Sequence, residues 1–176
     1  EASVLEKYPS VRFTRDYSEV LELSSIDAVV LATPAATHFE MARRALLAGK
    51  DVFVEKPLAL KASDGADLVD LAARKGRILM VGHILQYHPA VLKLKELITS
   101  GDIGRVQYMY SNRLNIGKIR TEENILWSFA PHDISVILSL LGEEPTEVRC
   151  TGGSHLNQGV ADVTLTDLAF PSGAKA

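Results

Sequence analysis

Hydrophobic and polar residues follow two distinct patterns along the first half of the chain. Short apolar runs, expected to be strands, stand at positions 28–32, 52–54 and 78–81, and a further short strand is expected at 11–14. After a helix tail at 1–7, apolar residues recur every three or four positions from Asp16, Thr37 and Ser63 onward, which predicts three helices. The run at 28–32 is apolar throughout, as in a strand covered on both faces. Strands that alternate with helices imply a parallel sheet, so we predict a doubly wound α/β domain.

Capping patterns mark the starts of two of these helices. Asp16 precedes Glu19 by three residues, and Thr37 precedes Glu40 by the same spacing. This spacing is typical of a capping box, in which the first side chain accepts a hydrogen bond from the helix backbone. We therefore expect Asp16 and Thr37 to be N-cap residues.

The pattern changes near Gly82. Helices are expected over about 91–98 and 134–141, and alternating strands at about 106–110, 147–151 and 161–169. Helices combined with alternating strands indicate the start of an α+β domain with a mainly antiparallel sheet open on one face. We therefore divide the chain into a partial parallel-sheet (Rossmann) domain at 1–83 and an α+β domain at 84–176.

Composition narrows the class of protein. The 176 residues are 47% hydrophobic, and 19 Lys and Arg against 22 Asp and Glu give a net charge of −3. The apolar fraction excludes a disordered chain, and the absence of a basic stripe argues against nucleic acid as a partner. No apolar run approaches the roughly 20 residues of a membrane span. We therefore expect a cytoplasmic globular protein. The single Cys150 alternates with Val148 on one face of a predicted strand, so we expect a buried structural thiol.

Both ends of the chain are expected to be incomplete. No glycine precedes Gly49, so the Gly-x-Gly-x-x-Gly turn that holds a pyrophosphate is missing. At the other end, the turn signal at 170–173 should return a hairpin arm for which only 174–176 remain. We interpret the chain as an internal piece that lacks the glycine-rich βαβ unit and the C-terminal part.

Candidate chemistry gathers where the predicted parallel strands end. Ligands of an open parallel sheet bind outside the carboxyl ends of the strands, against helix N-termini. The polar residues that follow these strand ends are Thr33, Pro34, Thr37, His38, Glu55, Lys56, Pro57 and His83. Thr33 and Pro34 equally fit a plain turn, and His38 fits a solvated surface position. Lys56 stands out because it directly follows a buried strand and precedes a proline that restricts the backbone.

A second candidate group lies in the other half. Pro131 suits the first turn of a helix, which would place His132 near the positive end of the helix dipole and keep its ring neutral, as a general base requires. In the alternative reading, Asp133 caps that helix and His132 is a structural polar residue. Polar or aromatic residues nearby could bind an acidic substrate group or line a pocket: Arg113, Asn115, Arg120 and Trp127. Core packing is the simpler role for the lone tryptophan.

Other constellations are not found in the sequence. One cysteine and five scattered histidines provide no zinc pattern and no His-Glu-x-x-His, so no metal site is expected. No Gly-x-Ser-x-Gly elbow supports a hydrolase.

Taken together, the ordered motifs resemble the glucose–fructose oxidoreductase/inositol dehydrogenase (Gfo/Idh/MocA) family over nearly the whole chain. The matching stretches are 27–34 with Thr37-His38, 54–58 with its Glu-Lys-Pro, Gly82-His83, 87–89, 101–104 and 131–134. The resemblance implies an NAD(P)-binding Rossmann domain and a C-terminal domain that packs against the substrate and often forms subunit contacts.

The resemblance also implies roles for individual residues. Thr33, Pro34 and His38 would line the dinucleotide, with Glu55 beside its nicotinamide end. Lys56 would contact the substrate hydroxyl and the nicotinamide, and His132 would be the general acid/base. Pro57 would also belong to the cofactor-binding set, and its peptide bond is expected to be cis. Arg113, Asn115, Arg120, Trp127 and Asp133 remain candidates for substrate contact.

The chain departs from many relatives at two positions. An aspartate is common four residues before the histidine, where Ser128 stands, and an arginine is common at Gln86. The stretch 124–127 is similar to relatives that act on nucleotide-linked amino sugars.

The leading hypothesis is an NAD- or NADP-dependent sugar or sugar-nucleotide oxidoreductase that is a homo-oligomer at full length. Two alternatives retain the fold: a non-catalytic NAD(P)-sensing regulator, and an enzyme that cleaves a glycosidic bond through transient oxidation. The presence of both Lys56 and His132 favours the oxidoreductase. The piece by itself is expected to be inactive.

Overall fold

A computed structural model describes residues 2–114 and 124–176, with side chains described from residue 5 onward. The chain divides into two compact units, Glu1–Gly82 and His83–Ala176, and we describe each by itself. No helix among the described residues is long and apolar enough to cross a membrane. The candidate residues 115 and 120 lie outside the described residues.

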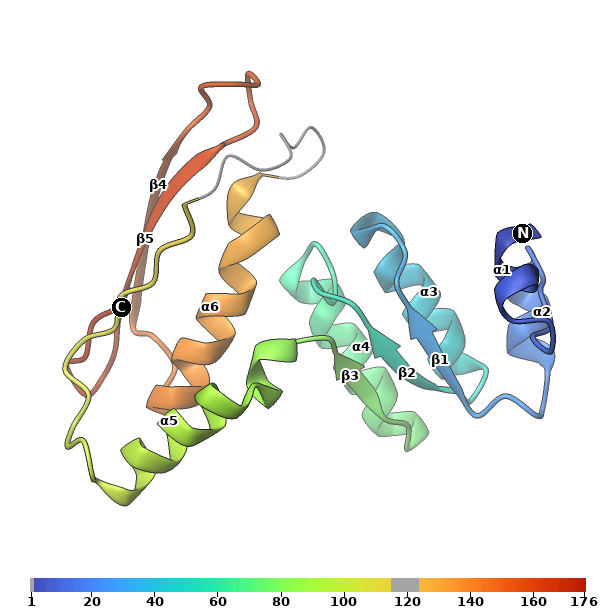
Figure 1. The fold of residues 1–176 in the computed structure, drawn as a ribbon, viewed down its shortest axis with the longest axis horizontal. Helices are drawn as coiled ribbons and strands as arrows, with labels where there is room; N and C mark the ends of the chain where they lie inside the picture. The colour runs from blue at the N-terminus through green and yellow to red at the C-terminus, as the bar shows by residue number, and fades with distance from the viewer. Residues whose placement is uncertain (1, 115–123) are drawn as a thin grey trace. The chain divides into compact units, whose positions relative to one another are not determined.

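The first unit contains a three-stranded parallel sheet in the order β1-β2-β3 (Figure 1). Its elements are α1 (Ala2–Lys7), α2 (Tyr17–Glu22), β1 (Ala28–Leu31), α3 (Ala35–Leu47), β2 (Asp51–Val54), α4 (Ala62–Lys75) and β3 (Leu79–Val81). The register aligns Leu31 with Val54 and Val54 with Val81, so the three strands end together. The prediction of a parallel sheet with alternating helices is confirmed.

The core of this unit lies between the sheet and two helices. Val29, Leu31, Val52 and Val54 point from the sheet into a buried cluster with residues of α3 and α4. Alternate residues of a strand point to opposite faces, so Val30 points away from this cluster and is 69% exposed. The prediction that this strand is covered on both faces is therefore wrong for the part of the chain that the structure describes.

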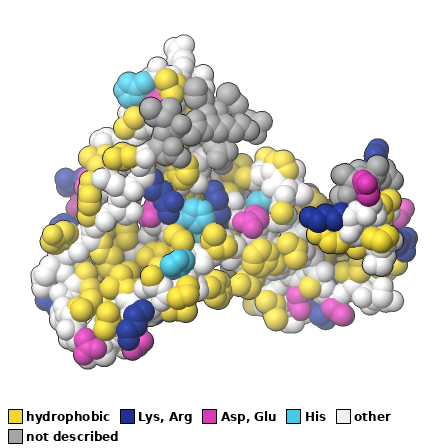
Figure 2. Space-filling model, in the orientation of Figure 1, with side chains coloured by type: hydrophobic (Ala, Val, Ile, Leu, Met, Phe, Trp, Pro, Cys, Tyr) yellow, Lys and Arg dark blue, Asp and Glu magenta, His cyan; other side chains and the backbone are white. Residues whose placement is uncertain are grey.

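Apolar side chains also reach the surface elsewhere, as the yellow areas over both units show (Figure 2). Exposed examples are Val30, Ile78, Leu114, Val163 and Leu165. Each unit therefore has apolar residues that face solvent as well as buried ones.

Two local expectations in this unit need correction. Positions 11–14 form no strand; Val11 instead donates to the Tyr8 carbonyl in a turn. Thr37 is not an N-cap, because α3 begins at Ala35 with Pro34 as the capping position. The expectation for Asp16 is confirmed: it caps α2, and its carboxylate accepts a hydrogen bond from the Ser18 amide at 2.8 Å.

Lys50 fastens the segment that joins α2 to β1. Its side chain is buried, and Nζ donates to the carbonyls of Leu23 and Ile26 at 2.8 Å each. A buried ammonium is stable only when its donors are satisfied. These two hydrogen bonds therefore hold the entry to the sheet.

Replacing Lys50 by methionine tests this role. Lys50→Met preserves much of the buried volume but removes two hydrogen bonds from a charged donor, so we expect a loss of about 2 kcal/mol in the free energy of unfolding. Urea unfolding of the two proteins measures the difference. Lys61→Met, at an exposed position where the side chain makes no capping bond, is the control and should unfold like the wild type. Equal midpoints for Lys50→Met and wild type would contradict the assignment.

The second unit combines helices with a two-stranded antiparallel sheet (Figure 1). Its elements are the 3₁₀ helix η1 (Ile84–Tyr87), α5 (Pro89–Ser100), α6 (Ile125–Leu141), β4 (Glu147–Gly153) and β5 (Val163–Ala169). Leu168 of β5, with Phe170 and Ala174, is buried against apolar residues of α6. An antiparallel pair packed on one helix matches the predicted α+β start.

The last residues of the chain hydrogen-bond on two sides. After a turn in which Gly173 has a φ of 86°, Ala176 exchanges hydrogen bonds with Leu168, so the predicted return of the hairpin arm is confirmed. On the other side, Lys175 pairs with Tyr108 in a parallel bridge. This isolated bridge is the whole of the strand expected at 106–110.

Cys150 is exposed, which corrects the expectation of a buried thiol. The core of the second unit forms between α6 and the end of β5, whereas six of the seven residues of β4 are exposed. Alternation with Val148 was therefore a poor guide, because Val148 is itself 60% exposed.

Candidate functional site

The carboxyl edge of the parallel sheet carries the first group of candidate residues. β1 ends at Leu31, two residues before Thr33, and β2 ends at Val54, directly before Glu55 and Lys56. The register of the strands places these two exits side by side. The peptide bond between Lys56 and Pro57 is cis, as the family resemblance implied.

Hydroxyl groups line the exit from β1. Thr37 Oγ1 lies 2.8 Å from Thr33 Oγ1 and 2.8 Å from the Pro34 carbonyl oxygen. Thr37 therefore forms its hydrogen bonds from inside the first turn of α3, and one of them helps to hold the side chain of Thr33. Thr33 is half-buried and Pro34 is exposed, so both can be reached from solvent.

His38 is the most buried polar side chain of this edge, with 1% of its surface exposed. Its Nδ1 lies 2.7 Å from the Pro57 carbonyl oxygen, and its Nε2 lies 2.8 Å from the Thr33 carbonyl oxygen. The reading as a solvated surface residue is wrong. The first turn of α3 faces the two neighbouring loops, and it directs the ring inward.

The side chain of Glu55 packs against Gly82, the residue that follows β3. The Gly82 amide donates to the Val54 carbonyl, and a Cβ added at Gly82 would meet the Glu55 carboxylate at 3.0 Å and the Phe53 ring at 3.3 Å. Only a residue without a side chain lets both groups pack there undisturbed. Sequence reasoning named Glu55 but could not see that Gly82 leaves room for it.

The second group of candidates lies on α6, in a different position from the one expected. The helix begins at Ile125, with the Asn124 side chain accepting from the Trp127 amide, and Pro131 lies inside it. His132 therefore occupies the middle of a 17-residue helix, away from the positive end of the dipole. The proposed effect of the dipole on this ring is overturned, and Asp133 does not cap the helix.

The 3₁₀ helix η1 contacts α6 close to His132. Ser135 Oγ donates to the His132 carbonyl at 2.8 Å, and Gln86 Nε2 donates to the Ser135 carbonyl at 2.6 Å. Ser128, one turn before His132, is 3% exposed. Gln86 and Ser128 thus both lie on or against this part of α6.

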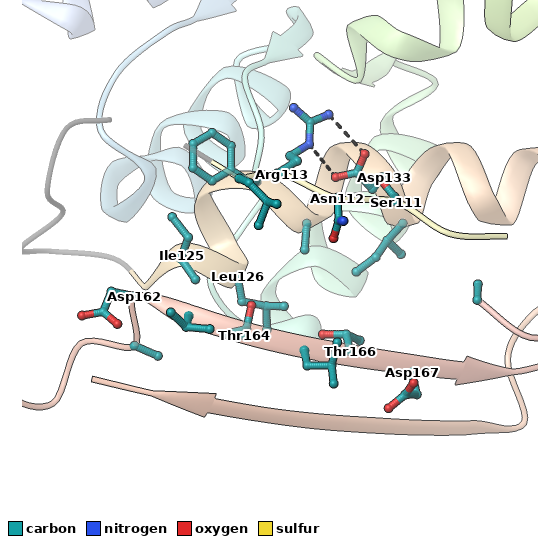
Figure 3. Close-up of a pocket in the computed structure, with 18 of the residues that line it drawn as sticks. Ser111, Asn112, Arg113, Ile125, Leu126, Asp133, Asp162, Thr164, Thr166 and Asp167 are labelled. Carbon is teal, nitrogen blue, oxygen red and sulfur yellow. Dashed lines mark hydrogen bonds and ion pairs between the residues drawn. The ribbon is translucent and has the colours of Figure 1, made fainter. Parts of the chain in front are cut away.

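A cavity of about 850 Å³ opens on another face of the same helix (Figure 3). It is bounded by α6, β5, the segment 109–114 and the loop between β4 and β5. Consecutive helix residues point about 100° apart, so Asp133 lines the cavity while His132 is absent from its lining. Trp127 is also absent from this lining, and at 38% exposed it is not a core residue.

Arg113 and Asp133 form an ion pair at the cavity wall (Figure 3). Arg113 Nε and Nη2 donate to the two carboxylate oxygens of Asp133 at 2.5 and 3.2 Å. A bidentate pair of this kind fixes the direction of the guanidinium group. The positive charge of Arg113 is therefore already compensated within the protein.

A histidine–aspartate pair that sequence reasoning missed lies at the other end of the cavity lining. His155 Nδ1 donates to Asp162 Oδ1 at 2.8 Å, and the amides of His155 and Leu156 donate to Oδ2. The hydrogen bond from the His155 side chain is the main reason that the pKa of Asp162 lies below its ordinary value of 3.8. The described residues contain no group of three potential metal ligands.

The lowered pKa of Asp162 predicts a pH dependence of stability. The unfolded chain takes up this proton at a higher pH than the folded protein, so the stabilisation is complete above the unfolded pKa and is lost as pH falls through the folded one. We expect the free energy of unfolding to fall less steeply below about pH 5 in Asp162→Asn than in wild type. Urea unfolding over a pH series measures both slopes. Asp70→Asn, at an exposed position on α4, should keep the wild-type slope; an unchanged slope in Asp162→Asn would contradict the prediction.

Comparison with known proteins identifies the family. The family model described as "Oxidoreductase family, NAD-binding Rossmann fold" matches residues 1–83, and the one described as "GFO/IDH/MocA C-terminal domain" matches residues 91–176. The chain therefore belongs to the GFO/IDH/MocA family of oxidoreductases.

Named relatives include enzymes of sugar and cyclitol chemistry. The chain is 33% identical to the scyllo-inositol 2-dehydrogenase (NAD(+)) of Bacillus subtilis, with 93% of this chain and 51% of the relative covered. It is 32% identical to the 2,7-anhydro-N-acetylneuraminate hydratase of Mediterraneibacter gnavus, with 88% and 44% covered. The structure of UDP-N-acetylglucosamine 3-dehydrogenase from Acidithiobacillus ferrooxidans matches with a TM-score of 0.85 at 28% identity, with 99% and 54% covered. The chain spans about half the length of these proteins.

Proposed function

We propose that the whole protein is an NAD(P)-dependent oxidoreductase acting on a hydroxyl-bearing carbon of a sugar or cyclitol. The observation that carries the proposal is the position of Lys56, which directly follows the central strand of a parallel sheet whose three strands end together. Ligands of such sheets bind at this edge. Relatives named as dehydrogenases of scyllo-inositol and of UDP-N-acetylglucosamine support the substrate class.

The residues at this edge fit a nicotinamide dinucleotide. Thr33 and Pro34 are accessible at the exit from β1, and the glycine at position 82 leaves space in which Glu55 lies against the end of β3. In the proposal, Thr33 and Pro34 line the dinucleotide, and Glu55 stands beside its nicotinamide end. When bound, the nicotinamide supplies hydride acceptance and donation.

In the proposal, Lys56 and His132 have separate roles at the reacting carbon. Lys56 donates a hydrogen bond to the substrate hydroxyl oxygen and so favours the carbonyl that forms there. His132 takes the proton from that hydroxyl while the carbon gives up hydride, and it returns the proton in the reverse reaction. The proposal requires one group from each unit of the chain.

The substrate side involves the second unit. Because Asp133 holds Arg113 in a bidentate pair, Arg113 acts by keeping the cavity wall in place rather than as a free cation for an acidic group. Its remaining N–H groups can still donate to a substrate oxygen. Asn115 and Arg120 remain candidates for substrate contact on the basis of the sequence.

A second candidate function is the net hydration of a sugar. It rests on the relative named as a hydratase, which is 32% identical over 164 residues. Net hydration adds water and leaves the cofactor redox state unchanged at the end of a turnover. Product formation without accumulation of reduced cofactor distinguishes it from dehydrogenation.

Substitution of the two proposed catalytic residues tests the dehydrogenase. In the whole protein, assayed with NAD⁺ or NADP⁺ and either scyllo-inositol or UDP-N-acetylglucosamine, we expect Lys56→Met and His132→Asn each to lower kcat by about 10²- to 10⁴-fold. The affinity for the dinucleotide should change little in His132→Asn, because that substitution leaves the edge residues 33, 34, 55 and 56 in place. Absorbance of the reduced cofactor gives the rate, and fluorescence titration gives the affinity.

Two matched variants control for loss of a charge or a ring. Lys61→Met removes an exposed lysine, and His88→Asn retains the N-cap of α5; both should keep the wild-type rate. Wild-type kcat in Lys56→Met and His132→Asn would show that the roles are wrong. Dinucleotide binding without turnover of any sugar or cyclitol would favour the non-catalytic regulator.

A further inference from the structure

His38 joins two loops that leave neighbouring strands of the parallel sheet. Its ring is 1% exposed, and its two nitrogens lie 2.7 Å from the Pro57 carbonyl oxygen and 2.8 Å from the Thr33 carbonyl oxygen. Thr33 follows β1, and Pro57 follows β2. One buried side chain therefore bridges the two backbone segments that carry the proposed cofactor and substrate contacts.

The chemistry of the two partners determines what the ring must supply. A carbonyl oxygen only accepts hydrogen bonds, whereas a neutral imidazole donates from one nitrogen and accepts at the other. The Pro57 and Thr33 carbonyl oxygens lie 2.7 and 2.8 Å from the two ring nitrogens, within hydrogen-bond distance, so each carbonyl can accept from the nitrogen that faces it.

We propose that His38 is a positioning residue that, through both ring nitrogens, ties the Thr33 loop to the Pro57 loop and so sets the place of Lys56. This inference rests on the proposed function of Lys56. The Pro57 carbonyl belongs to the residue next to Lys56, so a hydrogen bond to that oxygen restrains the backbone of Lys56 itself. Catalytic groups must be held within about 0.5 Å of their working position.

The proposal replaces the direct contact with the dinucleotide that the family resemblance implied for His38. Both polar atoms of the ring are occupied by backbone carbonyls, and the side chain has almost no exposed surface. His38 therefore acts on the cofactor and substrate only through the two loops. An imidazole suits this role because its two nitrogens sit at a fixed separation on a rigid ring.

Two substitutions in the whole protein separate the ring's hydrogen bonds from its volume. His38→Phe fills the site without donors, and we expect kcat to fall by about 10- to 100-fold with a much smaller change in the KM for the sugar. His38→Gln retains an amide donor for one of the carbonyls, so its kcat should lie between those of His38→Phe and wild type. Leu46→Ala, which truncates a fully buried residue of the same helix, should lower thermal stability and leave kcat per folded molecule unchanged.

The loop restraint is also measured without turnover. Amide hydrogen exchange at Glu55, Lys56 and Leu58 should be faster in His38→Phe than in wild type and Leu46→Ala. This measurement stands even if Lys56→Met proves fully active, a result that would refute the proposed function and leave the bridge between the loops in place. Equal exchange and equal kcat in His38→Phe and Leu46→Ala would overturn the positioning role.

Nitrogen-15 NMR of the wild-type ring keeps the proposal testable if His38→Phe fails to fold. A ring N–H of His38 should exchange slowly because it is buried against a carbonyl, whereas the ring of His155, whose side chain is 68% exposed, should exchange fast. A His38 ring that exchanges as fast as that of His155 would overturn the bridge.

Discussion

Parallel hydrogen bonding between β1, β2 and β3 is the constraint on which the candidate site depends. The register that aligns Leu31, Val54 and Val81 brings three strand ends to one edge. Residues far apart in the sequence thereby become neighbours, and the loops that leave this edge start from fixed points. The core beneath the sheet stabilises this arrangement, because α3 and α4 bury the alternate residues of β1 and β2. The ring of His38 links two of these loops, so both strand pairing and a buried side chain hold the edge in place.

The second unit shows how one helix can serve two environments. Along α6, Asp133 faces the cavity and pairs with Arg113, whereas the neighbouring His132 is absent from that lining. Asp133 and Ile134 both line the cavity, so the face of α6 toward it begins after His132 in this turn of the helix. The cavity is therefore not evidence for the place of the reaction. The walls of the cavity include β5 and the segment 109–114. The last residues of the chain, 174–176, form hydrogen bonds both with the end of β5 and with the start of that segment.

Membership of the GFO/IDH/MocA family agrees with the chemistry at the sheet edge, although it does not assign a substrate. Relatives with similar identity are named as a dehydrogenase and as a hydratase. Under the proposed function, the edge residues would serve proton and hydride transfer at a hydroxyl-bearing carbon in either case. Discrimination between substrates would then come from residues that face the substrate.

The alternation of strands and helices in the parallel sheet, the position of Lys56 after a buried strand, and the family were all accessible from the sequence, because periodicity and short-range motifs are local properties. What the sequence left open depended on partners distant along the chain. His38 could be read as a surface residue until the fold supplied two carbonyls for its ring, and Pro131 was assigned to a helix start because local rules favour proline there. The expected burial of Cys150 failed for the same reason, since alternation predicts which residues share a face but not whether anything covers that face. Burial and hydrogen-bond partners are properties of packing, so only the tertiary structure decided them.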